Sequence, residues 1–169
     1  LEGRAPKPEA AAAAPFRPVM LAHPVESDDL AGLEPAAFRA EWKWDGIRVQ
    51  AVREGDVRRL YTRTGDDISA AFPDVVAHLN RDGAIDGELL ARRPEGGPAP
   101  FSDLQQRLNR KTVSKSLMEK HPAFIRAYDL LAEGEEDLRT LPFRRRRERL
   151  ERFVEQARSD RIDLSEPVP

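Results

Sequence analysis

The residue types with the clearest potential for chemistry lie together between positions 41 and 48. If this run is extended, alternation places Glu41, Lys43 and Asp45 on one face and both tryptophans on the other. Ionisable groups gathered on one face need partners or a ligand, because an unpaired buried charge is strongly unfavourable. The pattern therefore predicts either a polar reaction site or an ion-pair cluster in which Lys43 bridges Glu41 and Asp45.

Lys43 is the candidate nucleophile of this run. A free lysine has a pKa of about 10.4, so few amines are deprotonated at neutral pH unless a cation or desolvation lowers that pKa. Arg48 supplies a fixed positive charge suited to phosphate, and Gly46 permits close backbone approach. We predict nucleophilic attack by Lys43 on a phosphoryl centre, assisted by Arg48 and a divalent cation.

A second candidate pair is Asp86 and Glu88, in the strand-like run 84–91. Alternation places both carboxylates on the same face, where they could engage Mg²⁺ or accept hydrogen bonds from ribose hydroxyls. Gly87 between them weakens a strand, which indicates close approach of a ligand. The alternative is a solvated strand face.

Two further positions have a functional and a structural interpretation. Arg63 precedes Thr64 and Gly65 after the run 57–62, which predicts either a sugar or phosphate contact or a simple turn with positive φ at Gly65. Tyr128 alternates with aliphatic residues, so it is either a stacking surface for a base or ordinary core.

The run 41–48 resembles motif I of the covalent nucleotidyltransferases, which are ATP-dependent DNA ligases, RNA ligases and capping enzymes. The segments 62–69, 84–90 and 124–131 resemble later motifs of that superfamily in the same order. Within it, residues 16–22, 104–111 and 128–131 look most like bacterial ATP-dependent DNA ligases of the repair-associated type.

The resemblance implies that Lys43 becomes covalently bound to AMP, with ATP and Mg²⁺ or Mn²⁺ as cofactors. The parent enzyme would pass AMP to a 5′-phosphate and seal nicks in duplex DNA. The remaining implied roles are Glu41 at the adenine edge, Tyr128 stacked on the base, Arg48 and Arg63 at ribose or phosphates, Glu88 at ribose or metal, and Asp45 beside the lysine and the metal, with Gly46 completing the motif.

The family pattern also contains a later Glu-Gly-hydrophobic-Lys motif and a Lys-x-Lys motif, and neither occurs before Pro169. The resemblance therefore implies the N-terminal part of an adenylation domain, inactive or weak alone. Its expected partners are nicked duplex DNA and the missing C-terminal part with its oligonucleotide-binding domain, and a monomer is expected. The alternatives are a noncatalytic nucleotide- or DNA-binding fragment, or an RNA ligase or capping-type enzyme.

The expected fold class is α+β, an antiparallel or mixed sheet with flanking helices, because strand and helix patterns do not alternate regularly. Residues 1–15, rich in Ala and Pro, predict a disordered linker or expression remnant, followed by the partial adenylation domain at 16–169. We expect strands at 38–44, 47–52, 57–62, 84–91 and 123–131, and helices at 73–79, at 102–108 with a Ser102–Gln105 capping box, and at 143–158.

Composition agrees with one globular domain, since 28 Lys and Arg balance 30 Asp and Glu at a net charge of −2. The chain has no Cys and no apolar run near the roughly 20 residues that span a bilayer, which favours a cytoplasmic protein without membrane partners. Any DNA contact must be local, and the favoured candidates are Arg107, Arg110 and Lys111. The arginine-rich helix at 144–158 is interleaved with Glu, which favours a solvated helix with internal ion pairs.

Overall fold

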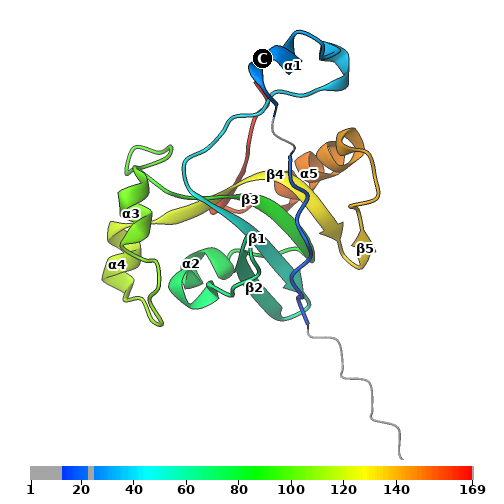
Figure 1. Ribbon diagram of the computed structural model, residues 1–169. Helices are drawn as coiled ribbons and strands as arrows, with labels where there is room; N and C mark the ends of the chain where they lie inside the picture. Colours follow the sequence, from blue (N-terminus) through cyan, green and yellow to red (C-terminus); the bar gives the residue numbers. More distant parts are fainter. Residues whose placement is uncertain (1–12, 23–24, 169) are drawn as a thin grey trace, which may run out of the picture.

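The computed structural model describes residues 13–22 and 25–168. Its centre is a six-stranded sheet in the order β2-β1-β3-β4-β5, antiparallel along that order, with β6 pairing parallel to β4 (Figure 1). The predicted α+β class with a mixed sheet and flanking helices is confirmed. The strands are β1 (Ile47–Glu54), β2 (Val57–Thr62), β3 (Gly83–Ala91), β4 (Ala123–Glu133), β5 (Glu136–Asp137) and β6 (Ile162–Leu164).

Strands β1 and β2, both predicted from the sequence, pair as an antiparallel hairpin. Its register pairs Glu54 with Val57, leaving a two-residue connection of Gly55 and Asp56. Gly55 has a φ of 57°, a conformation that glycine adopts without steric cost.

One face of the sheet carries the main hydrophobic core. In β1, Val49 and Ala51 point to this face and are buried, as the strand period of two requires. Leu150 and Phe153 of α5 pack into the same cluster. The helices are α2 (Pro73–Val76), α3 (Phe101–Gln105), α4 (Lys115–Lys120) and α5 (Phe143–Ala157), with a 3₁₀ turn η2 (Ser69–Ala71). No helix within the described residues has the length and apolar character needed to cross a membrane.

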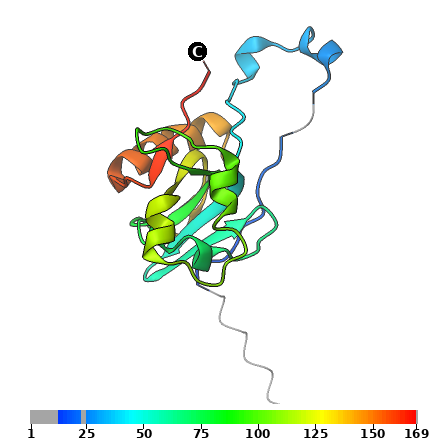
Figure 2. The ribbon, with the colours of Figure 1, turned by 90° about the vertical axis from the view of Figure 1, so that its left-hand side faces the viewer.

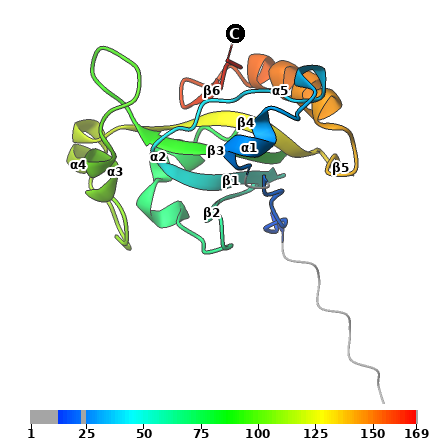
Figure 3. The same ribbon diagram turned by 45° about the horizontal axis from the view of Figure 1, so that its top comes forward.

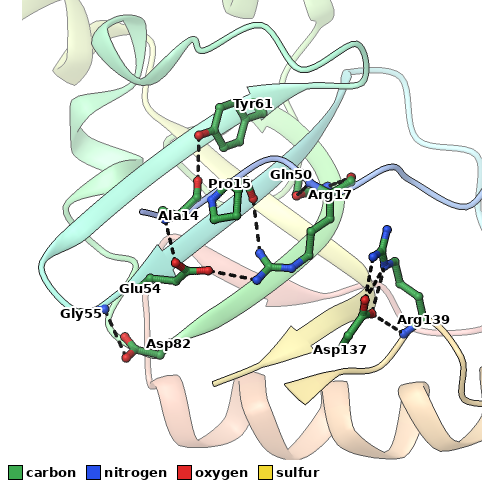
Figure 4. A network of polar contacts seen from close by, with 10 residues as sticks. All are labelled: Ala14, Pro15, Arg17, Gln50, Glu54, Gly55, Tyr61, Asp82, Asp137 and Arg139. Atoms are coloured by element: carbon green, nitrogen blue, oxygen red, sulfur yellow. Dashed lines mark hydrogen bonds and ion pairs between the residues drawn. The ribbon is translucent and has the colours of Figure 1, made fainter. Parts of the chain in front are cut away.

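The opposite face of β1 is covered by residues 14–22, which we call the N-terminal strap (Figure 4). The side chain of Gln50, fully buried, accepts from the Arg17 backbone N–H at 2.8 Å and donates to the Arg17 carbonyl at 2.7 Å. The Gln50 amide thus satisfies the backbone N–H and carbonyl of Arg17, as a neighbouring strand would do in a sheet. Ala14 is buried, and its N–H donates to Glu54 at 2.9 Å.

Burial of Ala14 shows that the ordered domain begins before Phe16, so the predicted boundary lies slightly too late. The other residues of the predicted linker, 1–12, lie outside the described part of the chain.

The predicted strand at 38–44 is wrong. These residues form only an isolated bridge between Glu41 and Pro167, and they follow a projecting segment that contains α1 (Ser27–Leu30) and η1 (Pro35–Ala37) (Figure 2). Aromatic and charged residues alternate there, but no strand of the sheet lies beside them to form a ladder. Residues 40–46, which carry Lys43, are called the wall segment below.

The predicted capping box at Ser102 is also wrong. Helix α3 begins at Phe101, and Pro100 at its N-cap provides no side-chain hydrogen bond. Helix α4, which was not predicted, does have a serine N-cap. The Ser114 hydroxyl accepts from the backbone N–H of Leu117. Pro100 has a φ of −56° and a ψ of 146°, so the non-helical N-cap residue that we expected to be Ser102 is a proline.

Candidate active site

A cavity of about 540 Å³ opens on the strap-covered face of the sheet. It brings together six residues predicted for the site from regions far apart in the sequence, namely Glu41, Lys43, Arg48, Asp86, Glu88 and Tyr128. The remaining lining residues come from the strap, the wall segment, β4 and α5, and are Met20, Leu21, Ala22, Trp42, Trp44, Asp129, Phe143 and Arg146.

The floor of the cavity contains a two-pronged ion pair between neighbouring strands. Arg48 of β1 donates to Asp86 of β3 through Nε at 3.1 Å and through Nη2 at 2.6 Å. The same Nη2 donates to the carbonyl of Met20 in the strap at 2.7 Å. Burial raises the pKa of the Asp86 carboxyl, and the Arg48 guanidinium opposes that rise. Arg48 is therefore held from the sheet and from the strap at once.

A second ion pair of the same kind lies beside it. Arg146 of α5 donates to Asp129 of β4 through Nε at 2.9 Å and through Nη2 at 3.0 Å, and both residues are buried. Asp86 and Asp129 are paired directly across β3 and β4. Two facing carboxylates would repel each other, so each needs its own arginine.

Neighbouring residues Tyr128 and Asp129 both line the cavity because β4 is bulged there. The register passes from the pair Asp86–Asp129 to the pair Gly87–Ala127, which leaves Tyr128 as an extra residue on β4. The Arg48 guanidinium lies 5.8 Å from the centre of the Tyr128 ring. Burial raises the pKa of the Tyr128 hydroxyl, so it stays protonated and can donate.

Glu88 adds a titratable carboxyl to the floor. Burial raises its pKa to about 7, against the opposing effects of a backbone hydrogen bond from Gly46 and the charge of Arg48. Both glycines near it are needed for backbone approach. A Cβ on Gly46 would lie 2.3 Å from the Leu89 carbonyl oxygen, and one on Gly87 would lie 2.7 Å from the Arg126 carbonyl oxygen. The glycine at 87 thus admits strand β4, which corrects our interpretation that it admits a ligand.

Lys43 is exposed at the rim of the cavity. Among the described residues it forms no ion pair with Glu41 or Asp45, so the predicted ion-pair cluster is not formed. Asp45 is exposed and does not line the cavity, and neither does Arg63, which is exposed in the turn after β2. Gly65 in that turn has a φ of 92°, as predicted.

The three basic residues predicted to contact DNA differ in their exposure to solvent. Arg107 is fully buried, pairs with Asp74, and lies 4.7 Å from the centre of the Phe72 ring, so the prediction that it contacts DNA is wrong. Its position within an irregular basic run gave no sign of burial. Arg110 and Lys111 are exposed and remain predictions.

Helix α5 confirms the predicted internal ion pairs, with Arg144 and Arg145 near Glu148 and Arg147 near Glu151. Arg146 is the exception. It lies about one helical turn before Leu150 and is therefore on the apolar side of the helix.

Sequence reasoning missed Asp129 and Arg146 as site residues. The signal for Arg146 was its place in the series Arg146, Leu150, Phe153 and Ala157, all of which are buried. Asp129 could not be assigned to the cavity by alternation, because alternation without the bulge places Tyr128 and Asp129 on opposite faces.

The chain matches a known family along most of its length. The sequence profile described as "ATP dependent DNA ligase domain" covers residues 19–168. The DNA ligase of Thermococcus onnurineus (strain NA1) is 38% identical over 148 residues, which are 84% of this chain and 26% of that protein. The chain thus spans about a quarter of the length of the curated relatives it matches.

Solved structures agree with this match. The ligase domain of LigD from M. tuberculosis superposes with a TM-score of 0.63 at 25% identity, over 82% of this chain and 43% of that domain. A mycobacterial DNA ligase D complexed with ATP and MES has a TM-score of 0.56 at 25% identity, over 75% of this chain and 39% of that one. Among the three enzyme classes that motif I allows, these matches favour the DNA ligases. The chain belongs to the ATP-dependent DNA ligase domain family and corresponds to the N-terminal part of its nucleotidyltransferase domain.

Proposed function

We propose that this chain binds ATP in the cavity and accepts AMP on Lys43. The Nζ of a deprotonated Lys43 attacks the α-phosphorus, a P–N bond forms, and the bond from that phosphorus to the pyrophosphate oxygen breaks. The observation that carries the proposal is one cavity lined by Lys43, Arg48, Glu88 and Tyr128. In the family, motif I supplies the lysine that this step requires.

The other lining residues suit the parts of a nucleotide. The Tyr128 ring offers a flat apolar surface for a base, and Glu41 at the rim can accept hydrogen bonds from a base amine. Arg48 has its Nε and Nη2 engaged, which leaves the Nη1 side of its guanidinium for ribose or phosphate oxygens. Glu88, with its raised pKa, can accept from or donate to ribose hydroxyls near neutral pH.

A divalent cation fits this floor only in part. No cluster of three or more His, Cys, Asp or Glu side chains capable of holding a metal occurs in residues 13–22 and 25–168. Mg²⁺ is commonly held by one or two carboxylates together with substrate phosphates and water, and Glu88 is the carboxylate best placed for that role. The cation would neutralise charge on the pyrophosphate that leaves.

We further propose that the full gene product uses the AMP on Lys43 to activate a 5′-phosphate and seal nicks in duplex DNA during repair. Exposed Arg110 and Lys111 are the candidates in this chain for contact with DNA phosphates.

The experiment is incubation of the chain, and of the full gene product, with α-labelled ATP and Mg²⁺, followed by mass spectrometry of the labelled peptide. The expected result is one AMP on Lys43 and none in Lys43→Ala. Lys115→Ala is the matched control, because Lys115 is 87% exposed and lies away from the cavity. If the full gene product folds and stays unlabelled, Lys43 is not the nucleophile, and a noncatalytic nucleotide-binding module is the better interpretation.

A further inference from the structure

We propose that residues 162–168, the C-terminal segment, position the wall segment and thereby Lys43, with Ser165 and Arg126 as the positioning residues. This inference rests on the proposed function, because it concerns the same lysine. The contacts that carry it join distant parts of the chain, including Trp44 and Ser165, which are 121 residues apart.

The wall segment needs an external support because it belongs to no strand of the sheet. Its backbone meets the C-terminal segment at an isolated antiparallel bridge between Glu41 and Pro167, in which the N–H of Val168 donates to the Ala40 carbonyl at 3.2 Å. Figure 1 shows the C-terminal segment, in red, rising beside the chain that leads to the projecting segment. The two segments thus support each other outside the main ladder.

The side chain next to Lys43 provides the strongest link. The indole N–H of Trp44 donates to the Ser165 hydroxyl at 2.9 Å, and Ser165 is only 3% exposed. Ser165 is itself fixed, because its N–H donates to the Ala127 carbonyl at 2.8 Å and its own carbonyl accepts from Arg147 at 2.8 Å. Trp44 is therefore tied to β4 and α5 through one buried serine.

Arg126 holds the same indole from a second side. Its guanidinium lies 4.3 Å from the Trp44 ring centre and 5.3 Å from the Phe124 ring centre. Asp163 of β6 fixes that guanidinium through two hydrogen bonds of 3.0 Å each. Figure 3 shows β6 lying beside α5. A stacked arginine with a two-pronged partner is geometrically constrained, so the ring it covers is constrained too.

This arrangement has a consequence for the rate of the reaction. An amine at the rim of an open cavity can adopt many positions, and misplacement by about 1 Å costs on the order of 100-fold in rate. Immobilising Trp44 restricts the backbone at Lys43 without touching the nucleotide-binding floor. Loss of the Ser165 hydroxyl should therefore slow AMP transfer while ATP binding stays nearly constant.

The kinetic test compares Ser165→Ala, Ser165→Thr and the wild type in single-turnover labelling by α-labelled ATP, with ATP affinity measured separately in Lys43→Ala backgrounds. We expect Ser165→Ala to label about tenfold more slowly at saturating ATP, with affinity within about twofold, and Ser165→Thr to recover most of the rate. Ser114→Ala is the matched control, since it also removes one serine hydrogen bond, at the N-cap of α4. Equal rates in Ser165→Ala and wild type, or a rate loss fully explained by weaker ATP binding, would overturn the proposal.

A fluorescence test is independent of activity. The chain has two tryptophans, so Trp42→Phe leaves Trp44 as the only one, and its quenching by acrylamide reports how firmly it is held. We expect Ser165→Ala and Arg126→Gln to increase quenching in this background, and Ser114→Ala to leave it unchanged. If no form of the protein is labelled but quenching responds as expected, the proposed function fails and the positioning of Trp44 stands. Unchanged quenching in both variants contradicts the positioning itself.

Discussion

The floor and the wall of the cavity are built by opposite means. The floor residues Arg48, Asp86 and Asp129 stand on adjacent strands that are fixed by continuous ladders, and each charged group has a partner. The wall segment has no ladder, and it carries exposed Lys43 without an ion pair in the described structure. The groups proposed to receive a nucleotide are thus fixed by the sheet, whereas the proposed nucleophile lies on backbone held by one isolated bridge and by side-chain contacts.

This contrast gives a reason why the charged groups of the floor are paired and Lys43, within the described part of the chain, is not. A preorganised floor can stabilise phosphate charge without rearrangement, which is the more effective arrangement for electrostatic catalysis. A nucleophile fixed by a salt bridge would have a raised pKa and a lower fraction of free amine. Among the described residues, Lys43 forms no such salt bridge.

Lys43→Ala is the variant expected to show most clearly that the wall segment contributes to the reaction rather than to stability. Removal of the only proposed nucleophile should lower AMP labelling at least about 1000-fold, since no other group can replace it. The free energy of unfolding should change by less than about 0.5 kcal/mol, because the side chain is exposed and unpaired within the described structure. Urea titration of the variant beside labelling measures both, and a large loss of stability would show that the wall is structural.

Asp86→Ala should do the reverse and destabilise the fold itself. It leaves the partly buried Arg48 guanidinium without its two charge-assisted hydrogen bonds, at a cost of about 3 kcal/mol. Asp137→Ala is the matched control, because Asp137 also pairs with an arginine, Arg139, but both are solvent-accessible, and it should cost under about 1 kcal/mol. Urea unfolding of the two variants decides, and equal losses would contradict the distinction between floor and surface.

The same contrast explains which parts of the fold could be predicted from the sequence. Strands β1 to β4 have alternating or continuous apolar residues, so their positions were predicted to within a few residues, and with them Arg48, Glu88 and Tyr128. The wall segment has the composition of a strand without a neighbour to pair with, and composition alone does not reveal a missing neighbour.

Other failures have equally local causes. Asp129 reaches the cavity through a bulge. Arg107 is buried against Phe72 and pairs with Asp74, which lies 33 residues earlier in the sequence. Neither long-range partner is visible in a local pattern. Residues 16–22 of the strap were predicted to belong to the domain, but the position of the strap on the sheet was not predicted, because that position depends on the hydrogen bonds between the Gln50 side chain and the Arg17 backbone.

Gln50→Leu tests whether the strap is part of the rigid floor. It keeps the volume but leaves the N–H and carbonyl of Arg17 unpaired, which should cost about 2 kcal/mol in unfolding free energy. Because Met20 of the strap accepts from Arg48 and lines the cavity, ATP affinity should also fall severalfold. Gln106→Leu, at an exposed glutamine, is the control for a change in side-chain type. A stability loss without weaker ATP binding would show that the strap is dispensable for the cavity.

The smallest expected effect concerns Glu88, where floor chemistry depends on pH. Its folded pKa is about 7 against a model-peptide value near 4.5, so the folded state binds the proton more tightly than the unfolded state does. Stability is therefore greatest below about pH 4.5 for this group and falls as the pH rises toward 7, by an amount on the order of 1 kcal/mol after allowance for partial exposure. Unfolding measured from pH 5 to 8 should show this fall in the wild type and lose it in Glu88→Gln, whereas Glu119→Gln, at an exposed glutamate, should retain it. An identical pH profile in Glu88→Gln would mean that Glu88 is fully solvated, and the floor would then hold its charge only through the two arginine–aspartate pairs.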